Sequence, residues 1–270
     1  MKAQATYIAL TYWDVAASSL FLCIAAALTL VLRLGMARHI AIRAARMLAQ
    51  LIAIGFVLKF IFSATSPWIT LLAAAVMVSF AAREVLARQE RQLSGWWKYG
   101  LGPSAMMITG ALALIYALTL LIQPHPWYSP RYALPLFGMI LGNSMTGVAL
   151  GLNAITSAII REKAAIEARL LLGLSRWRAL RPFAARALRT GLTPIMNAMA
   201  ASGVISLPGM MTGQILSGTP PVEAVKYQLL IMFLISGVVG CGVIAAVFGT
   251  IARLTDARHR LRPDRLEESR

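Results

Sequence analysis

Apolar blocks of about twenty residues recur along the chain and constrain its fold more than any other feature. They cover residues 15–32, 47–63, 68–82, 101–122, 134–160, 192–207 and 227–251. A block of this length and character suits a helix that crosses a lipid bilayer. Hydrophobic residues make up 59% of the chain and charged residues only 13%, which separates it from soluble domains. The sequence therefore predicts an all-α polytopic membrane protein with about seven transmembrane helices.

The distribution of positive charge predicts an orientation. Of the 26 Lys and Arg residues, 22 fall in the segments 33–46, 83–98, 161–189 and 253–270. If the first segment is cytoplasmic, alternation of the helices makes the other three cytoplasmic as well, as the positive-inside rule requires. The N-terminus is then outside and the C-terminus cytoplasmic, in a cell (inner) membrane. The net charge of +16 is mostly a signal of topology, and we expect no binding to nucleic acid.

We expect one transmembrane domain over residues 1–252 and a cytoplasmic basic tail over residues 253–270. Two segments of the membrane domain differ from the rest. Residues 161–190 are too charged to cross a membrane, and residues 206–224 are rich in Gly and Pro yet carry almost no charge.

The block at 134–160 has small residues on two opposite faces. Gly138 and Gly142 form one small-xxx-small pair, and Gly147 and Gly151 form a second pair about 180° around the helix. Small residues allow close approach of helices in lipid, so this helix is predicted to lie in the middle of a bundle. Asn143 and Ser144 leave two interpretations open: hydrogen bonds between helices, or a polar patch on a substrate path.

The segment 161–190 is patterned as two helices. Strong helix formers fill residues 162–172, Gly173 is placed to end that helix, and Ser175 is placed to cap a second, short helix. Pro182 is expected to kink or end this second helix. The product would present an apolar ridge among arginines, formed by Leu174, Trp177 and Leu180. It either rests on anionic lipid headgroups or docks a soluble partner.

The spacing favours docking. Glu167, Ala168 and Gly173 form the pattern E-A-x-x-x-x-G, which is similar to the coupling loop of ABC-transporter permeases, E-A-A-x-x-x-G. Arg169 departs from that pattern. The chain contains no G-x-x-x-x-G-K-[ST] phosphate loop. If transport is driven by ATP, the ATPase is a separate cytoplasmic subunit that binds the ATP and Mg, and this chain needs no cofactor.

Three stretches together carry a family resemblance. They are "GMILGNSMTGVALGLN" (138–153), the segment around Glu167 and Gly173, and "SLPGMMTGQILSGTPPVEAVKYQLLIMFLI" (206–235). The chain resembles the FetB-type family of ABC permeases, which comprises bacterial iron-export permeases and related plant proteins of aluminium tolerance. The resemblance implies a permease that exports iron, acts as a homodimer and pairs with a separate ATPase. It implies no ATPase site and no catalytic residues in this chain.

The stretch 206–221 places helix breakers between two apolar blocks. Irregular backbone at membrane depth is tolerated where protein buries it or where it borders a water-filled cavity. We expect a re-entrant segment or an outer gate, with Met210, Met211, Thr212 and Gln214 facing the pathway and Glu223 at its outer mouth. A Gly/Pro-rich outer turn packed against the bundle is the alternative. No Cys/His cluster has the spacing of metal ligands, so metal-binding residues stay unknown and iron follows from the resemblance alone.

Other functions are weaker interpretations of the same residues. An intramembrane serine protease built on Ser144 would need a base at the same depth, and no histidine lies in the predicted helices. A membrane anchor or sensor would leave the polar features of 138–153 and 206–224 without a purpose. An importer, or a transporter of a non-metal solute, is the nearest alternative.

Overall fold

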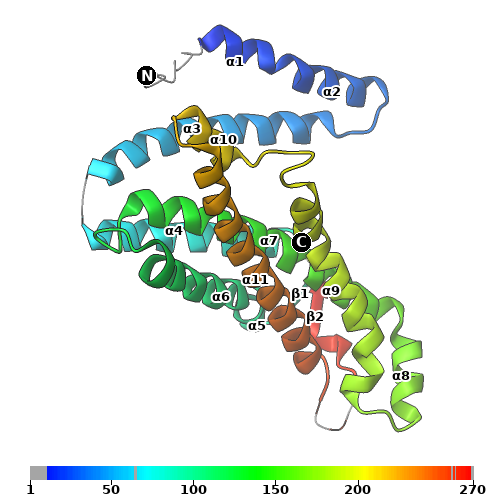
Figure 1. Cartoon of the computed structure of the whole chain (residues 1–270). Coiled ribbons are helices and arrows are strands. Elements are labelled where there is room, and N and C mark those ends of the chain that lie inside the picture. The colour runs from blue at the N-terminus through cyan, green and yellow to red at the C-terminus, as the bar shows by residue number, and fades with distance from the viewer. Residues whose placement is uncertain (1–10, 64–65, 257, 259, 269–270) are drawn as a thin grey trace. The chain divides into compact units, whose positions relative to one another are not determined.

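The computed structural model describes residues 11–63, 66–256, 258 and 260–268, and it is helical almost throughout (Figure 1). The α-helices are α1 (Tyr12–Ser18), α2 (Leu20–Val31), α3 (Ala37–Ser63), α4 (Pro67–Ala87), α5 (Trp97–Gly100), α6 (Gly102–Tyr116), α7 (Pro130–Arg161), α8 (Lys163–Leu171), α9 (Arg176–Ala201), α10 (Gly209–Leu216) and α11 (Pro221–Arg253). A π-helix, η1 (Ala117–Ile122), continues α6, and a 3-10 turn, η2 (Pro263–Arg265), precedes the second of two short strands, β1 (Arg91–Leu93) and β2 (Leu266–Glu268). This confirms the predicted fold class.

The chain divides into two compact units. The first unit comprises residues 1–65 and 214–219, and the second comprises residues 66–213 and 220–270. In the first unit, α2 and α3 pack on each other as a helical hairpin. Its α1 begins at a capping box, in which the hydroxyl of Thr11 accepts from the backbone N–H of Asp14 and the Asp14 carboxylate accepts from the backbone N–H of Thr11.

Helix α7 is the centre of the second unit. It packs against α4, α6, α9 and α11, and its buried residues run from one end of the helix to the other. The sequence predicted this central place from the small residues of the helix. The core around it is aliphatic, with Ile140, Val148 and Ile155 fully buried.

One of the two small-residue faces of α7 makes the predicted close contacts. A Cβ atom on Gly191 of α9 would lie 2.8 Å from the carbonyl oxygen of Gly147 and 2.7 Å from Cγ1 of Val243 in α11. Only glycine fits where three helices meet at this distance. The prediction for the other face was wrong for Gly142, because a Cβ atom there would meet nothing within 4 Å. A Cβ atom on Gly138 would lie 3.2 Å from the end of the Met77 side chain, which is flexible.

Six helices of the described residues are long and apolar enough to cross a membrane, and the sequence predicted about seven. The difference is α9, which was expected to cross at 192–207 but is one continuous helix from Arg176 to Ala201. Only a narrow face of α9 is buried, and the rest is too polar to qualify by composition. Helix α9 nevertheless packs against α7 and α11 in the second unit.

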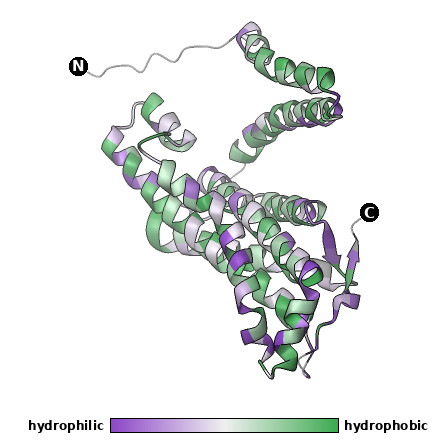
Figure 2. Ribbon diagram, turned by 90° about the vertical axis from the view of Figure 1, so that its right-hand side faces the viewer, coloured by the Kyte–Doolittle hydropathy of each residue, from purple (hydrophilic) through white to green (hydrophobic). Residues whose placement is uncertain are grey.

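Polar residues gather at one end of the second unit, where α4, α7 and α11 end and α9 begins (Figure 2). We call this the basic end. Here residues 254–256 and 260–268 form a C-terminal strap that folds back on the unit. Strand β2 pairs antiparallel with β1, with Leu266 opposite Leu93, and the backbone N–H of Arg262 donates to the carbonyl of Leu254 at 2.9 Å. The strap thus joins the end of α11 to the segment between α4 and α6.

Candidate functional site

A sharp turn between α8 and α9 forms the tip of the basic end. The backbone N–H of Gly173 donates to the carbonyl of Leu170, and that of Leu174 donates to the carbonyl of Arg169. Together with a φ of +82° at Gly173, these two bonds are a Schellman motif, which ends a helix with a left-handed residue. The prediction that Gly173 ends the first helix is confirmed. Ser175 is the N-cap residue of α9, as predicted, although its side chain makes no capping hydrogen bond.

The tip exposes apolar side chains that the sequence analysis missed. Leu171 is 87% exposed and Leu172 is 82% exposed, whereas Leu174 and Trp177 are partly covered. The Trp177 ring lies against Phe248 of α11, with 6.0 Å between the ring centres. The signal that would have found the two leucines is their position directly before Gly173, since residues at a Schellman turn project from the end of the helix. Below, the apolar tip means residues 171–174.

Helix α8 is fixed to the bundle behind this tip. Ile166 is fully buried in the core. The Arg186 guanidinium pairs with Glu162 at 2.7 Å and also lies over the ring of Phe183, 5.0 Å from its centre. Arg169 of α8 lies 5.6 Å from the centre of the same ring. A force applied at the apolar tip therefore reaches α7 and α9 through packed side chains.

The predicted coupling residues lie on this surface. Glu167 is half-buried and pairs with Lys163 one turn earlier at 3.6 Å, and Ala168 is exposed. The expectation that Leu180 belongs to the exposed ridge was wrong, because Leu180 is fully buried in the core. The prediction of a short second helix was also wrong: α9 continues through both Pro182 and Pro194.

A second group of polar residues lies halfway along α7 and α9. We call it the polar band; its members are exposed or half-buried, and they are Asn143, Thr146, Thr190, Thr193 and Asn197. Helices α7 and α9 are antiparallel and touch at Gly147 and Gly191. Every member of the band lies within about two turns of that contact, so the five residues share one depth. A helix face that contacts lipid at this depth would be apolar instead.

The polar band presents oxygen acceptors. Each of its three threonine hydroxyls donates to the carbonyl four residues earlier in its own helix, at 2.7 to 3.2 Å. The amide nitrogen of Asn143 donates to the carbonyl of Met139 at 2.8 Å. With the donors engaged, the hydroxyl oxygens and the Asn143 carbonyl oxygen keep free lone pairs. At the basic end of the band, Arg88 donates to Thr146 at 3.4 Å and pairs with Glu84.

The structure separates the two residues that the sequence paired as pathway candidates. Asn143 belongs to the exposed polar band, but its neighbour Ser144 is fully buried. The Ser144 hydroxyl has no hydrogen-bond partner among the described residues. Ser144 therefore lies in the core in this conformation and does not border the exposed face.

The stretch that was predicted to form a gate is partly regular. Residues 209–216 form the short helix α10, and non-helical backbone is confined to the segments on either side of it. Met210 is exposed, Met211 and Thr212 are half-buried, and the Thr212 hydroxyl donates to the carbonyl of Pro208 at 3.2 Å. Gln214 lies in the last turns of the same helix. Glu223, at the start of α11, pairs with Lys226 at 2.7 Å.

Among the described residues, no cluster of metal ligands marks the predicted pathway. An apolar groove of about 640 Å³ lies between α6 and α11, lined by residues such as Leu112, Phe233 and Cys241, and none of the pathway residues lines it. Within the described part of the chain, no three His, Cys, Asp or Glu residues come together as metal ligands.

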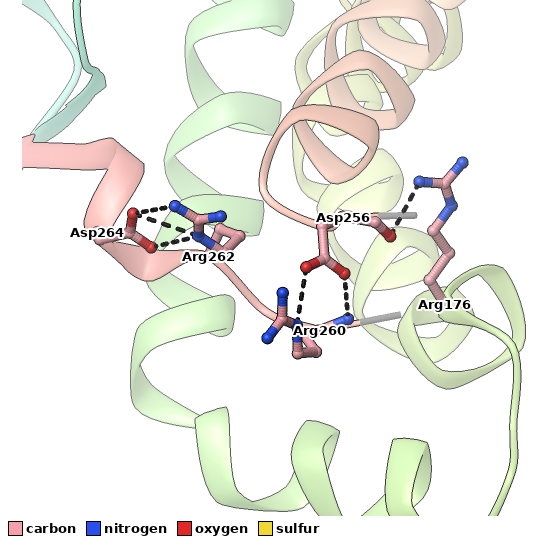
Figure 3. A network of polar contacts seen from close by, with 5 residues as sticks. All are labelled: Arg176, Asp256, Arg260, Arg262 and Asp264. Atoms are coloured by element: carbon pink, nitrogen blue, oxygen red, sulfur yellow. Dashed lines mark hydrogen bonds and ion pairs between the residues drawn. The ribbon is translucent and has the colours of Figure 1, made fainter. Parts of the chain in front are cut away.

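The C-terminal strap adds a network of ion pairs at the basic end (Figure 3). Asp256 accepts from the backbone N–H of Arg260 at 2.8 Å and from its guanidinium at 2.9 Å, and these bonds hold the pKa of Asp256 below its usual range. The Arg262 guanidinium binds both oxygens of Asp264 and lowers the pKa of that carboxyl. Arg176, at the start of α9, donates to the backbone carbonyl of Asp256 at 3.5 Å. The strap therefore also contacts the helix that follows the apolar tip.

Comparison with known proteins identifies relatives over most of the chain. The model of the uncharacterised protein family UPF0014 matches residues 12–255. A UPF0014 membrane protein of Synechocystis is 42% identical over 70% of this chain and 73% of its own length. The probable iron export permease protein FetB of Escherichia coli is 31% identical over 80% of this chain and 81% of its own length. The protein ALUMINUM SENSITIVE 3 of Arabidopsis thaliana is 34% identical over 71% of this chain and 68% of its own length. No solved structure matches the chain.

Proposed function

Because this chain belongs to the UPF0014 family of membrane proteins, we propose that it is the permease subunit of an ABC transporter, driven by a separate cytoplasmic ATPase. Family membership and the six apolar helices make the chain a multi-pass membrane protein, and a relative named as a permease makes its function transport. The ATPase partner, a homodimer of this chain, and binding of ATP and Mg by the partner alone belong to the proposal.

The apolar tip is the observation that carries the proposal. Two adjacent leucines, both more than four-fifths exposed, project from the basic end, which the positive-inside rule makes cytoplasmic. Exposed apolar residues with a charged rim are typical of a protein interface. The Schellman turn fixes the tip, and Ile166 and Phe183 join α8 to the core. Such a rigid element can pass the motion of a docked ATPase to α7 and α9.

We place the substrate path along the polar band. Its oxygen acceptors suit a cation that moves in steps, since none of them forms a site tight enough to hold a metal. The iron cargo and the direction of export rest on the name of the relative in Escherichia coli. A non-metal cargo is the alternative, because a plant relative is named for aluminium sensitivity and not for metal transport.

The test uses the permease purified with its candidate ATPase in lipid. We expect the double substitution Leu171→Asp and Leu172→Asp, and separately Glu167→Arg, to abolish complex formation or the coupled ATPase activity. Ile205→Asp is the matched control, since Ile205 is 83% exposed and lies beyond the far end of α9. If the tip variants fold and keep full coupled activity, the tip is not the ATPase contact and the proposal fails.

Cargo is tested in the same preparation. The proteoliposomes carry the ATPase on their outer face, and ATP and iron are added to the outer solution. They should accumulate iron inside only when both subunits are present. If the complex hydrolyses ATP but no iron compound stimulates the hydrolysis, the transporter assignment is kept and iron is excluded as the cargo.

A further inference from the structure

Arg253, the last residue of α11, has an unmet hydrogen-bonding group. Its guanidinium lies over the ring of Trp97, 4.7 Å from the ring centre. The Nε–H of Arg253 is buried and has no acceptor anywhere in the described part of the chain. A buried donor without an acceptor destabilises the folded state, and more so when the donor is charged. This position is therefore suited to an acceptor that the chain itself does not supply.

The surroundings of Arg253 carry uncompensated positive charge. Both aspartates of the C-terminal strap are already used, Asp256 by Arg260 and Asp264 by Arg262. Among the described residues, neither Arg253 nor Arg265 has a carboxylate partner. Arg265 donates to the backbone carbonyl of Arg253 at 2.7 Å, which brings the two arginines together and satisfies a carbonyl at the end of α11. Arg253 thus lies in the positive fields of Arg265 and Arg262.

The level of Arg253 in the membrane restricts the class of anion that it can bind. Arg253 ends a helix that is apolar enough to cross the bilayer, so it marks the level at which that helix leaves the hydrocarbon region. Trp96 and Trp97 are both exposed at this end, where aromatic side chains lie at the level of lipid headgroups. The anion available at this level is phosphate, and a guanidinium group binds two phosphate oxygens at once.

We propose that Arg253 and Arg265 bind a phosphate group at the basic end, supplied by the headgroup of an anionic phospholipid. Trp97 supports the Arg253 guanidinium from one face, and the phosphate accepts from the buried Nε–H. Basic pockets on the cytoplasmic side of membrane proteins bind anionic headgroups in this way. The proposal needs only a membrane and does not depend on the transport function.

The experiment measures lipids retained by the whole chain. The protein is reconstituted in vesicles of equal parts phosphatidylglycerol and phosphatidylethanolamine, extracted in mild detergent and analysed by native mass spectrometry. Wild type should retain phosphatidylglycerol in preference. Arg253→Gln with Arg265→Gln should reduce this retention about tenfold, as expected for the loss of charge-assisted hydrogen bonds. Arg161→Gln with Arg178→Gln, two exposed arginines at the same end, removes equal charge and should change it less than about twofold.

Two further measurements distinguish a lipid phosphate from a soluble phosphate and show whether a loss of retention comes from misfolding. If about 10 mM inorganic phosphate, far below the concentration of lipid headgroups in a vesicle, displaces the lipid, the phosphate site stands and its ligand is a soluble phosphate. Arg253→Lys with Arg265→Lys keeps the charge and loses the two-oxygen geometry, so its retention should fall between wild type and the Gln variant. Equal retention of both lipids by wild type, or an equal loss in the control pair, would overturn the proposal.

Discussion

The two sides of α7 differ in packing: one side lies closely against other helices, and the other side has open space beside it. On one side, Gly147 lets α9 and α11 approach so closely that an added methyl group would collide with backbone. On the other side, Gly142 meets nothing within 4 Å, and Asn143 and Thr146 of the polar band follow it. Both sides carry the same small-xxx-small spacing. The spacing permits close approach, but only the facing helices decide whether the approach takes place.

The largest effect on stability should come from adding a side-chain atom on the closed side, where α7 packs against α9 and α11. Gly191→Ala would put a Cβ atom 2.8 Å from the Gly147 carbonyl, and backbone on both sides must then shift. Overpacking of this kind costs about 1–3 kcal/mol, so we expect a clear loss of thermal stability in detergent micelles. An unchanged unfolding temperature would mean that α9 does not pack on α7 at this contact.

Changes to the open side should affect transport and leave stability alone. Asn143→Leu and Thr193→Val keep the side-chain shapes and remove an oxygen acceptor. We expect each to lower the transport rate about tenfold, since a lost interaction with a charged cargo is worth about 1.5 kcal/mol. Transport assays and unfolding curves on the same samples check this. Normal transport with reduced stability would assign the polar band to packing.

Ser144, on the closed side, should respond in the opposite sense. Its hydroxyl is buried and has no partner within the described residues, so Ser144→Ala removes an unsatisfied group. We expect the free energy of unfolding to rise by about 1 kcal/mol and transport to stay unchanged. A fall in transport similar to that of Asn143→Leu would show that the hydroxyl becomes exposed during the transport cycle.

The smallest effect is expected at Gly142. Gly142→Ala adds a methyl group to open space, so the only expected effect is the better helix propensity of Ala, a gain in stability of about 0.5 kcal/mol. Size-exclusion chromatography with light scattering gives the oligomeric state of the same sample. If the variant loses a dimer that wild type forms, the open side is a contact with a second copy of the chain.

The helix ends that depend on particular residue types were predicted correctly from the sequence. Gly173 and Ser175 were placed correctly because a left-handed residue and an N-cap residue need particular side chains at particular positions. The continuity of α9 was missed because Pro182 was expected to kink or end the helix. A proline inside a helix is tolerated when the surrounding bundle holds the backbone.

The candidate site was only partly visible in the sequence. Asn143 was identified from its place in an apolar block, but the threonines of α9 were not, because no pattern shows that a half-polar helix lies at the same depth. Leu171 and Leu172 were taken only as part of the run of helix formers before Gly173. Their exposure is decided by the end of α8, and therefore by geometry rather than by composition.

The pairing of β2 with β1 has a consequence for how the chain matures. Leu93 and Leu266 are partners far apart in the sequence, and a ribosome that adds about 5–20 residues per second needs roughly ten to thirty seconds to travel between them. Throughout that interval the edge of β1 has no strand beside it, while α6, α7 and the later helices are being made. The basic end is therefore the last part of the second unit to close. A chain that stops before Leu266 keeps this edge open, which is the kind of exposed backbone that chaperones and proteases recognise.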